Sequence, residues 1–260
     1  MSRRSALMLT VAAVAGLIAF GWPLFVTPEI GFSTTLAPMV FAMVLPLVLA
    51  VVLSELSGRD MDAKALAMLG VLTAVGAVLR PLGTGTVGME PIFFLLIVGG
   101  YVFGAGFGFA QGALTLFASA LLTGGVGPWL PYQMLAAGFV GLGSGLLPKS
   151  DNPDRRRAIL VVLCGYAFWA SFAFGWLMDF AFWPFGIGPN SQFSFDPQSS
   201  PLENLHTFVL YNLVTSMGWN LGRAITSVAL LVLVGPGLLH ILQRAARKSS
   251  FGAASQVAVE

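Results

Sequence analysis

The sequence predicts an all-α integral membrane protein, a polytopic bundle of helices that crosses the lipid bilayer several times. Of its 260 residues, 57% are hydrophobic and only 9% carry a charge, whereas a soluble domain carries about 25% charged residues. The mean hydropathy is +0.85. Several apolar runs have about 20 residues, the length that a helix needs to cross a bilayer. These observations argue against a soluble enzyme, a nucleic-acid-binding protein or a disordered regulator.

Eight apolar runs are predicted to be membrane helices, because backbone polar groups in hydrocarbon must be hydrogen-bonded within their own segment. They cover residues 6–26, 37–53, 65–79, 91–103, 109–122, 129–147, 158–182 and 219–242. The fourth and fifth runs form one apolar stretch that is too long for a single span, so we divide it at the glycine-rich segment 104–108. The first run follows two arginines, as a signal peptide would, but its length favours an uncleaved anchor.

The basic residues predict the orientation of these eight spans. With the N-terminus in the cytoplasm, the inner segments hold 11 of the 13 basic residues, in accord with the positive-inside rule. The 11 are Arg3, Arg4, Arg59, Lys64, Lys149, Arg155, Arg156, Arg157, Arg244, Arg247 and Lys248. The outer loops, 27–36, 80–90, 123–128 and 183–204, hold only Arg80, and Arg223 lies within the last span. Both termini are therefore predicted to be cytoplasmic.

The connections between spans predict three further features. The charged loop 54–64 separates two N-terminal helices from the other six, and the proline-rich loop 183–204 is expected to be an ordered cap rather than a helix. Residues 203–217 are expected to form a separate or strongly bent outer helix. If they continued into the last span, the helix would be about 60 Å long, twice the hydrocarbon thickness. The tail 249–260 is expected to be disordered.

No catalytic, metal or cofactor site is predicted. The sequence has no HExxH, GxSxG or GxxxxGK[ST] motif and no pair of carboxylates on one helix. One cysteine and two histidines exclude a disulfide framework and a multi-histidine metal site. We therefore predict a protein that is not an enzyme, and any energy from ATP must come from another polypeptide.

Polar residues in or beside the spans are the strongest candidates for a substrate site, because ionisable side chains are costly in hydrocarbon and are usually functional. These candidates are Gln133, Asp179, Asn212, Asn220 and Arg223. Asp179 and Arg223 are both expected in the outer half of the membrane, where they could pair. The alternative is an ion pair that only fixes two helices. Arg80 and Glu90 flank the glycine-rich segment 81–89, which could fold over a ligand.

Aromatic residues gather near the predicted outer face. Those that we select as candidate ligand contacts are Trp129, Tyr132, Trp176, Trp183 and Trp219. Trp176, Asp179, Phe180 and Trp183 have i, i+3, i+4, i+7 spacing, so that one helical face mixes rings with a carboxylate. The alternative is the aromatic belt that membrane proteins form at the lipid–water interface.

Small residues form a second kind of pattern. Ala63, Ala67, Gly70 and Ala74 share one face of the third predicted span. Small residues let membrane helices approach closely, so this stripe is a candidate docking surface for a partner's helix. For most of the other glycines, plain packing within the bundle is a sufficient explanation.

From residue 63 to residue 248 the sequence resembles the substrate-binding S components of energy-coupling factor (ECF) vitamin transporters. The resemblance lies in the order of several short segments, and the proline, tryptophan and glutamine stretch that enters the sixth span is the most specific. This stretch is most similar to the corresponding stretch of the cobalamin-type S components. The segments are 80–83 (RPLG), 90–93 (EPIF), 104–108 (GAGFG), 124–135 (GGVGPWLPYQML) and 138–147 (GFVGLGSGLL).

The resemblance implies a multi-pass protein of a prokaryotic cytoplasmic membrane that captures a vitamin, with a corrinoid such as cobalamin as the best choice. It implies a six-helix core at residues 57–248. The two predicted helices at 1–56 precede this core, and the tail follows it. It also implies docking to a transmembrane coupling (T) component and two ABC-type ATPases through the stripe Ala63, Ala67, Gly70 and Ala74. The additional helices and Gly70 depart from the family pattern. A self-sufficient permease and a membrane scaffold remain alternatives.

Overall fold

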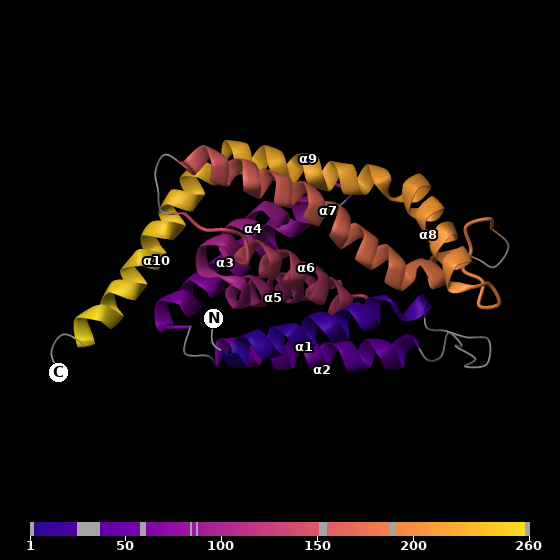
Figure 1. The fold of residues 1–260 in the computed structure, drawn as a ribbon, viewed down its shortest axis with the longest axis horizontal. Helices are drawn as coiled ribbons and strands as arrows, with labels where there is room; N and C mark the ends of the chain where they lie inside the picture. Colours follow the sequence, from indigo (N-terminus) through magenta and orange to yellow (C-terminus); the bar gives the residue numbers. More distant parts are fainter. Residues whose placement is uncertain are drawn as a thin grey trace.

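The computed structural model describes residues 3–24, 37–57, 61–83, 85–86, 88–150, 155–187 and 191–257, and these are almost entirely helical (Figure 1). The predicted outer loop 27–36, Arg59 and parts of the other predicted loops lie outside the described residues. The helices are α1 (Arg3–Phe20), η1 (Trp22–Leu24), α2 (Ala37–Leu56), α3 (Ala63–Leu79), η3 (Arg80–Gly83), α4 (Ile92–Phe103), α5 (Ala105–Thr123), α6 (Leu130–Gly145), α7 (Arg156–Gly186), α8 (Pro201–Thr215), α9 (Met217–Leu233) and α10 (Gly235–Val257).

Among the described residues, three helical segments are long and apolar enough to cross a membrane: Ala63–Gly83, Ala105–Thr123 and Arg156–Pro184. The bent pair formed by α8 and α9 qualifies as a fourth if it is one span. Three further apolar helices, Ala6–Phe20, Val44–Leu56 and Ile92–Phe103, are shorter. The chain is thus a multi-pass helical protein, while the count of eight spans and the cytoplasmic position of both termini stay predictions.

The predicted division of the fourth and fifth runs is confirmed at Gly104. This glycine ends α4 and begins α5 with a φ of 105°, a left-handed value that side chains rarely tolerate. The two helices then run back along each other, since the Gln111 side-chain amide donates to the backbone oxygen of Leu95. A one-residue break therefore makes a tight helical hairpin.

The centre of the bundle is the close packing of α5 against α6, where glycines replace side chains at the contact. A Cβ atom on Gly141 would collide with the backbone oxygen of Gly108, and one on Gly112 would collide with that of Ala137. Because apolar burial gives little net drive in lipid, such close backbone contact is a main source of helix association there.

The other helices lie on two sides of this centre. α1 and α2 lie side by side along one edge, and α7 and α9 run together along the opposite edge (Figure 1). The α1 helix is fixed to the core by aromatic contacts, with Phe20 edge-on to Tyr132 at 5.1 Å between ring centroids. The two N-terminal helices are thus part of the packed bundle.

The segment after residue 182 differs from its prediction. The expected cap begins as helix, since α7 continues to Gly186 through Pro184. A proline near a helix end removes only one late hydrogen bond, and the buried Trp183 side chain anchors this turn. The separate bent helix is confirmed, because α8 meets α9 at 62°.

The last predicted span, 219–242, is also interrupted. α9 ends at Leu233, and α10 begins at Gly235 and continues to Val257 at an angle to the bundle (Figure 1). Glycine and proline at 235–237 weaken helix continuity at this point. Residues 249–257, expected to be disordered, belong to α10. Residues 249–257 contain no proline, so the helix can continue through them at little cost once it has formed.

Candidate functional site

A pocket with a cavity volume of about 470 Å³ lies where η3, the starts of α4, α6 and α9, the end of α5 and the middle of α7 meet. Five of the predicted site residues line it together: Arg80, Glu90, Gln133, Trp219 and Arg223. Their separation in sequence, from residue 80 to residue 223, means that the fold rather than a local motif assembles this site.

Arg223 is held in the pocket wall by polar contacts on two sides. Its Nη2 donates to Glu90 Oε1 at 2.8 Å, and its Nη1 donates to the Ser171 backbone oxygen and to Asn220 Oδ1, both at 3.1 Å. The Arg223 side chain is only 7% exposed. Asn220, which does not line the pocket, therefore serves it by positioning Arg223.

Two phenylalanine rings, packed edge-on against each other, lie next to the same guanidinium. The ring centroids of Phe93 and Phe174 lie 5.2 and 5.0 Å from Arg223 Cζ, within the range of cation–π attraction. Ile92, Leu116 and Met178 add apolar surface to the pocket. A flat, apolar part of a ligand can therefore pack beside these rings.

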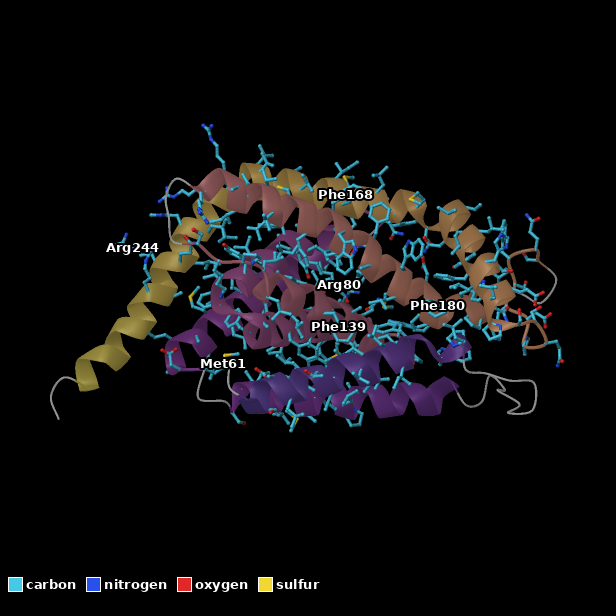
Figure 2. All side chains as sticks on the ribbon, viewed as in Figure 1. Met61, Arg80, Phe139, Phe168, Phe180 and Arg244 are labelled. Carbon is cyan, nitrogen blue, oxygen red and sulfur yellow. The ribbon has the colours of Figure 1, made fainter. Side chains whose placement is uncertain are left out.

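Arg80 has a different environment from Arg223. Its Nη2 donates to Gln133 Oε1 at 3.0 Å, and no carboxylate among the described residues forms an ion pair with it. Arg80 lies near the middle of the molecule, whereas Arg244 lies on α10 at one end (Figure 2). A partly enclosed cation without an ion pair is suited to an anionic ligand group.

The segment between η3 and α4 closes one side of the pocket by backbone contact. Gly88 has a φ of 72°, and a Cβ atom there would collide with the backbone oxygen of Trp219. Gly83 packs in the same way against the backbone of Met89. Glycine at these positions lets the segment lie directly on the start of α9, beside the predicted contact Trp219.

Asp179 and Asn212 form a separate polar contact. Asn212 Nδ2 donates to Asp179 Oδ2 at 2.6 Å, and neither residue lines the pocket. The expected pairing of Asp179 with Arg223 is wrong, because Arg223 forms its ion pair with Glu90. Asp179 points toward α8 instead, where an amide rather than a cation meets it.

The aromatic face of α7 packs against α8. The rings of Trp176, Phe180 and Trp183 pack against Phe208 with centroid distances of 6.0, 4.6 and 5.6 Å. The spacing thus identified a real shared face, but Trp176 and Trp183 do not line the pocket.

Trp129 and Tyr132 also lie away from the pocket. The Trp129 indole N–H donates to the Gly125 backbone oxygen, and the residue is 46% exposed. Tyr132 is buried, and its hydroxyl donates to the Ala19 backbone oxygen at 3.4 Å. Tyr132 therefore joins the core to α1.

Sequence reasoning missed Phe174 and Met178, which line the pocket from α7. They are four residues apart and share one face of the helix, and this face lies opposite the one that we had selected. Phe93 was part of the quoted segment 90–93 but was not named as a site residue.

The predicted docking residues Ala63, Ala67, Gly70 and Ala74 are all exposed on α3. Nothing lies within 4 Å of a Cβ atom placed on Gly70. Within the described part of the chain, no group of three or more histidine, cysteine, aspartate or glutamate residues is arranged to hold a metal ion.

Comparison with known proteins identifies the family. A family model described as "ECF transporter, substrate-specific component" matches residues 64–235. The chain belongs to this family. The match covers α3 to α9 and therefore includes the whole pocket, whereas α1 and α2 precede it.

Membership of the ECF substrate-specific components makes the protein a substrate-binding transport subunit rather than an enzyme. It also implies a small-molecule substrate and partnership with a T component and ATPases. No curated protein and no solved structure matches the chain.

Proposed function

We propose that this ECF substrate-specific component captures an anionic, ring-containing vitamin in the pocket that Arg80, Gln133, Trp219 and Arg223 line. Arg80 carries this proposal, since it is a cation in the pocket wall with no ion-pair partner among the described residues. A carboxylate or phosphate of the ligand would accept its hydrogen bonds, and Gln133 would orient it. The apolar walls around Phe93 and Phe174 would receive the ring.

The volume of the pocket favours a ligand smaller than our sequence prediction of a corrinoid. A cavity of about 470 Å³ is within the size range of pockets that enclose drug-sized molecules. A corrinoid, with its macrocycle and amide side chains, is larger than such molecules. We therefore place a compact vitamin ahead of cobalamin, and a ligand panel should contain both.

The same proposal includes the surrounding architecture. Residues 57–248 would form the substrate-binding core, which opens to the outer face of a prokaryotic cytoplasmic membrane. The face of α3 with Ala63, Ala67, Gly70 and Ala74 would contact the T component. Release into the cytoplasm would follow ATP-driven rearrangement of that assembly.

Ligand binding to the purified protein in detergent tests the proposal. Calorimetric titration with a vitamin panel should find a ring-bearing anion that binds the wild type. Arg80→Gln should weaken that binding by about 10- to 100-fold, the value of a charge-assisted hydrogen bond. Arg244→Gln, which removes an exposed cation from α10, should bind as the wild type does. A best ligand that is uncharged, or equal binding by Arg80→Gln, would contradict the proposal.

A further inference from the structure

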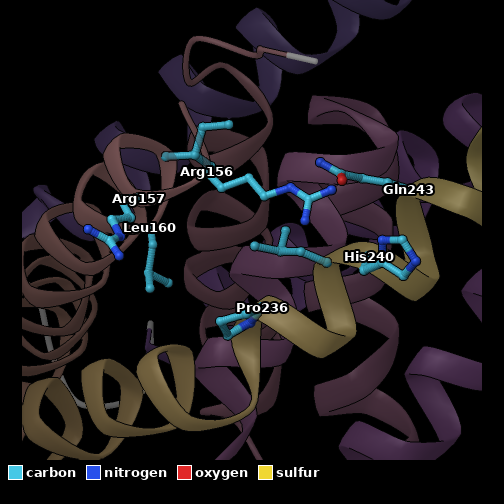
Figure 3. Close-up of a pocket in the computed structure, with 8 residues that line it drawn as sticks. Arg156, Arg157, Leu160, Pro236, His240 and Gln243 are labelled. Carbon is cyan, nitrogen blue, oxygen red and sulfur yellow. The ribbon is translucent and has the colours of Figure 1, made fainter. Parts of the chain in front are cut away.

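A second cavity of about 210 Å³ lies between the first turns of α7 and α10 (Figure 3). It shares no lining residue with the substrate pocket. Its location, at the end of the bundle where the basic residues gather, differs from that of the proposed substrate site, and nothing in the transport role derived above requires it.

The lining of this cavity is basic on one side and apolar on the other. Arg156 extends from α7 toward Gln243 on α10, and His240 lies one turn before Gln243 (Figure 3). Leu160 and Pro236 contribute apolar surface. Among the described residues, no carboxylate forms an ion pair with Arg156 or Arg157.

The backbone of α7 adds to the positive character of the cavity. α7 is a helix of 31 residues whose first turn contains no acidic residue, and its N-cap, Arg155, makes no side-chain capping bond. The first N–H groups of such a helix carry a partial positive charge that favours anions. The guanidinium groups and the start of the helix therefore both favour an anion in the cavity.

The α10 helix continues this basic surface along the edge of the bundle. Leu239 and Leu242 are buried, whereas Arg244 on the same helix is exposed. A smaller cavity of about 110 Å³ shares Gln243 and includes Lys149 and Arg247. An amphipathic helix with basic side chains is typical of a segment that lies at the surface of a membrane with anionic lipids.

We propose that the cavity between α7 and α10 binds the phosphate group of an anionic phospholipid. Dissolved phosphate has the same oxyanion chemistry, but only a lipid also has apolar groups to place against Leu160 and Pro236. The phosphate would lie between the Arg156 guanidinium and the start of α7. The glycerol and the first part of an acyl chain would lie along α10.

Native mass spectrometry of the full-length protein, in micelles with equal amounts of phosphatidylglycerol and phosphatidylcholine, tests this proposal. The wild type should retain phosphatidylglycerol preferentially. Arg156→Gln should lower that preference about fivefold, the effect of one basic residue at a membrane surface. Arg244→Gln, at an exposed cation on α10 outside the cavity, should lower it much less than Arg156→Gln does.

Two results would overturn the proposal. If Arg244→Gln lowers the preference as much as Arg156→Gln does, general surface charge attracts the lipid and the cavity has no special role. If excess inorganic phosphate removes the bound phosphatidylglycerol, the cavity is a site for a soluble anion. Neither result affects substrate binding, so failure here is distinct from failure of the proposed transport function.

Discussion

The Arg223 guanidinium is neutralised and enclosed within the protein itself. Glu90 supplies the counter-charge, and the rings of Phe93 and Phe174, which are edge-on to each other, both lie against the guanidinium. Arg80, in contrast, has a neutral partner in Gln133. The two arginines therefore have different environments, and the proposed function uses only the charge of Arg80 to bind a ligand.

The ion pair predicts a stability effect that a double variant can isolate. Glu90→Gln removes the counter-charge of Arg223 and should lower the free energy of unfolding by about 3 kcal/mol, the lower end for a broken buried pair. The double variant Glu90→Gln/Arg223→Met should lose less unfolding free energy than the sum of the losses in the two single variants. Thermal unfolding in detergent measures this. If the double variant loses as much unfolding free energy as the two single variants together, Glu90 and Arg223 do not stabilise each other.

At the scale of the helix, two glycines that look alike in sequence have opposite environments. A Cβ atom on Gly141 would collide with α5, whereas nothing lies within 4 Å of one on Gly70. Helical periodicity cannot distinguish them, because it shows which residues share a face but not what that face contacts. For the same reason the spacing of Trp176, Asp179 and Trp183 identified a shared face, but it could not show that this face contacts α8.

This contrast predicts different effects for the same substitution. Gly141→Ala forces α5 and α6 apart and should lower the free energy of unfolding by about 1–3 kcal/mol, as overpacked cores do. Gly70→Ala has space for its methyl group and should leave stability unchanged or raise it by about 0.5–1 kcal/mol. Thermal unfolding of both variants in the same detergent checks this. Equal losses of stability in the two variants would contradict the close contact between α5 and α6 at Gly141.

The start of α8 predicts a dependence on pH. Hydrogen bonds from Ser200 hold the pKa of the exposed Glu203 carboxylate below its ordinary value of 4.5. A carboxylate with a lowered pKa stabilises the fold at higher pH, and this contribution is lost as the pH falls through the lowered pKa. The first amides of α8 should therefore exchange faster below pH 4.5, after correction for intrinsic rates.

Hydrogen exchange read by mass spectrometry measures this effect, with Glu203→Gln as the control. The glutamine variant keeps an acceptor but cannot titrate, so the corrected exchange of its first turn should be independent of pH across the same range. If the wild type shows no acceleration, the capping box does not stabilise the start of α8.

At the scale of the molecule, the sequence was sufficient to predict the class of fold. It also predicted five residues that line the pocket, most of them charged or polar. Apolar runs and basic loops determine where helices lie, and the glycines at 104–108 marked the hairpin. The pairing of Glu90 with Arg223 was not predictable, because the partners are 133 residues apart. Their contact depends on how α4 and α9 pack, which no local pattern encodes.

The exposed stripe on α3 predicts that binding and coupling are separable. Ala67→Leu adds bulk to the proposed docking face and should reduce co-purification with the coupling module and ATP-dependent uptake about tenfold, equal to about 1.4 kcal/mol. Ligand affinity of the isolated protein should not change. Val75→Leu, at an exposed position on another face of α3, is the matched control. Uptake into liposomes by this protein alone would favour a permease.

The distance in sequence between Glu90 and Arg223 also has a consequence for synthesis of the chain. At about 5–20 residues per second, a ribosome needs about 7–27 s to make the 133 residues between them. Glu90 must therefore enter or await the membrane long before its counter-ion exists. The pocket of the proposed function is among the last parts of the protein to form. A chain that stops before α9 leaves Glu90 without its ion-pair partner, and only the more distant charge of Arg80 then acts on it.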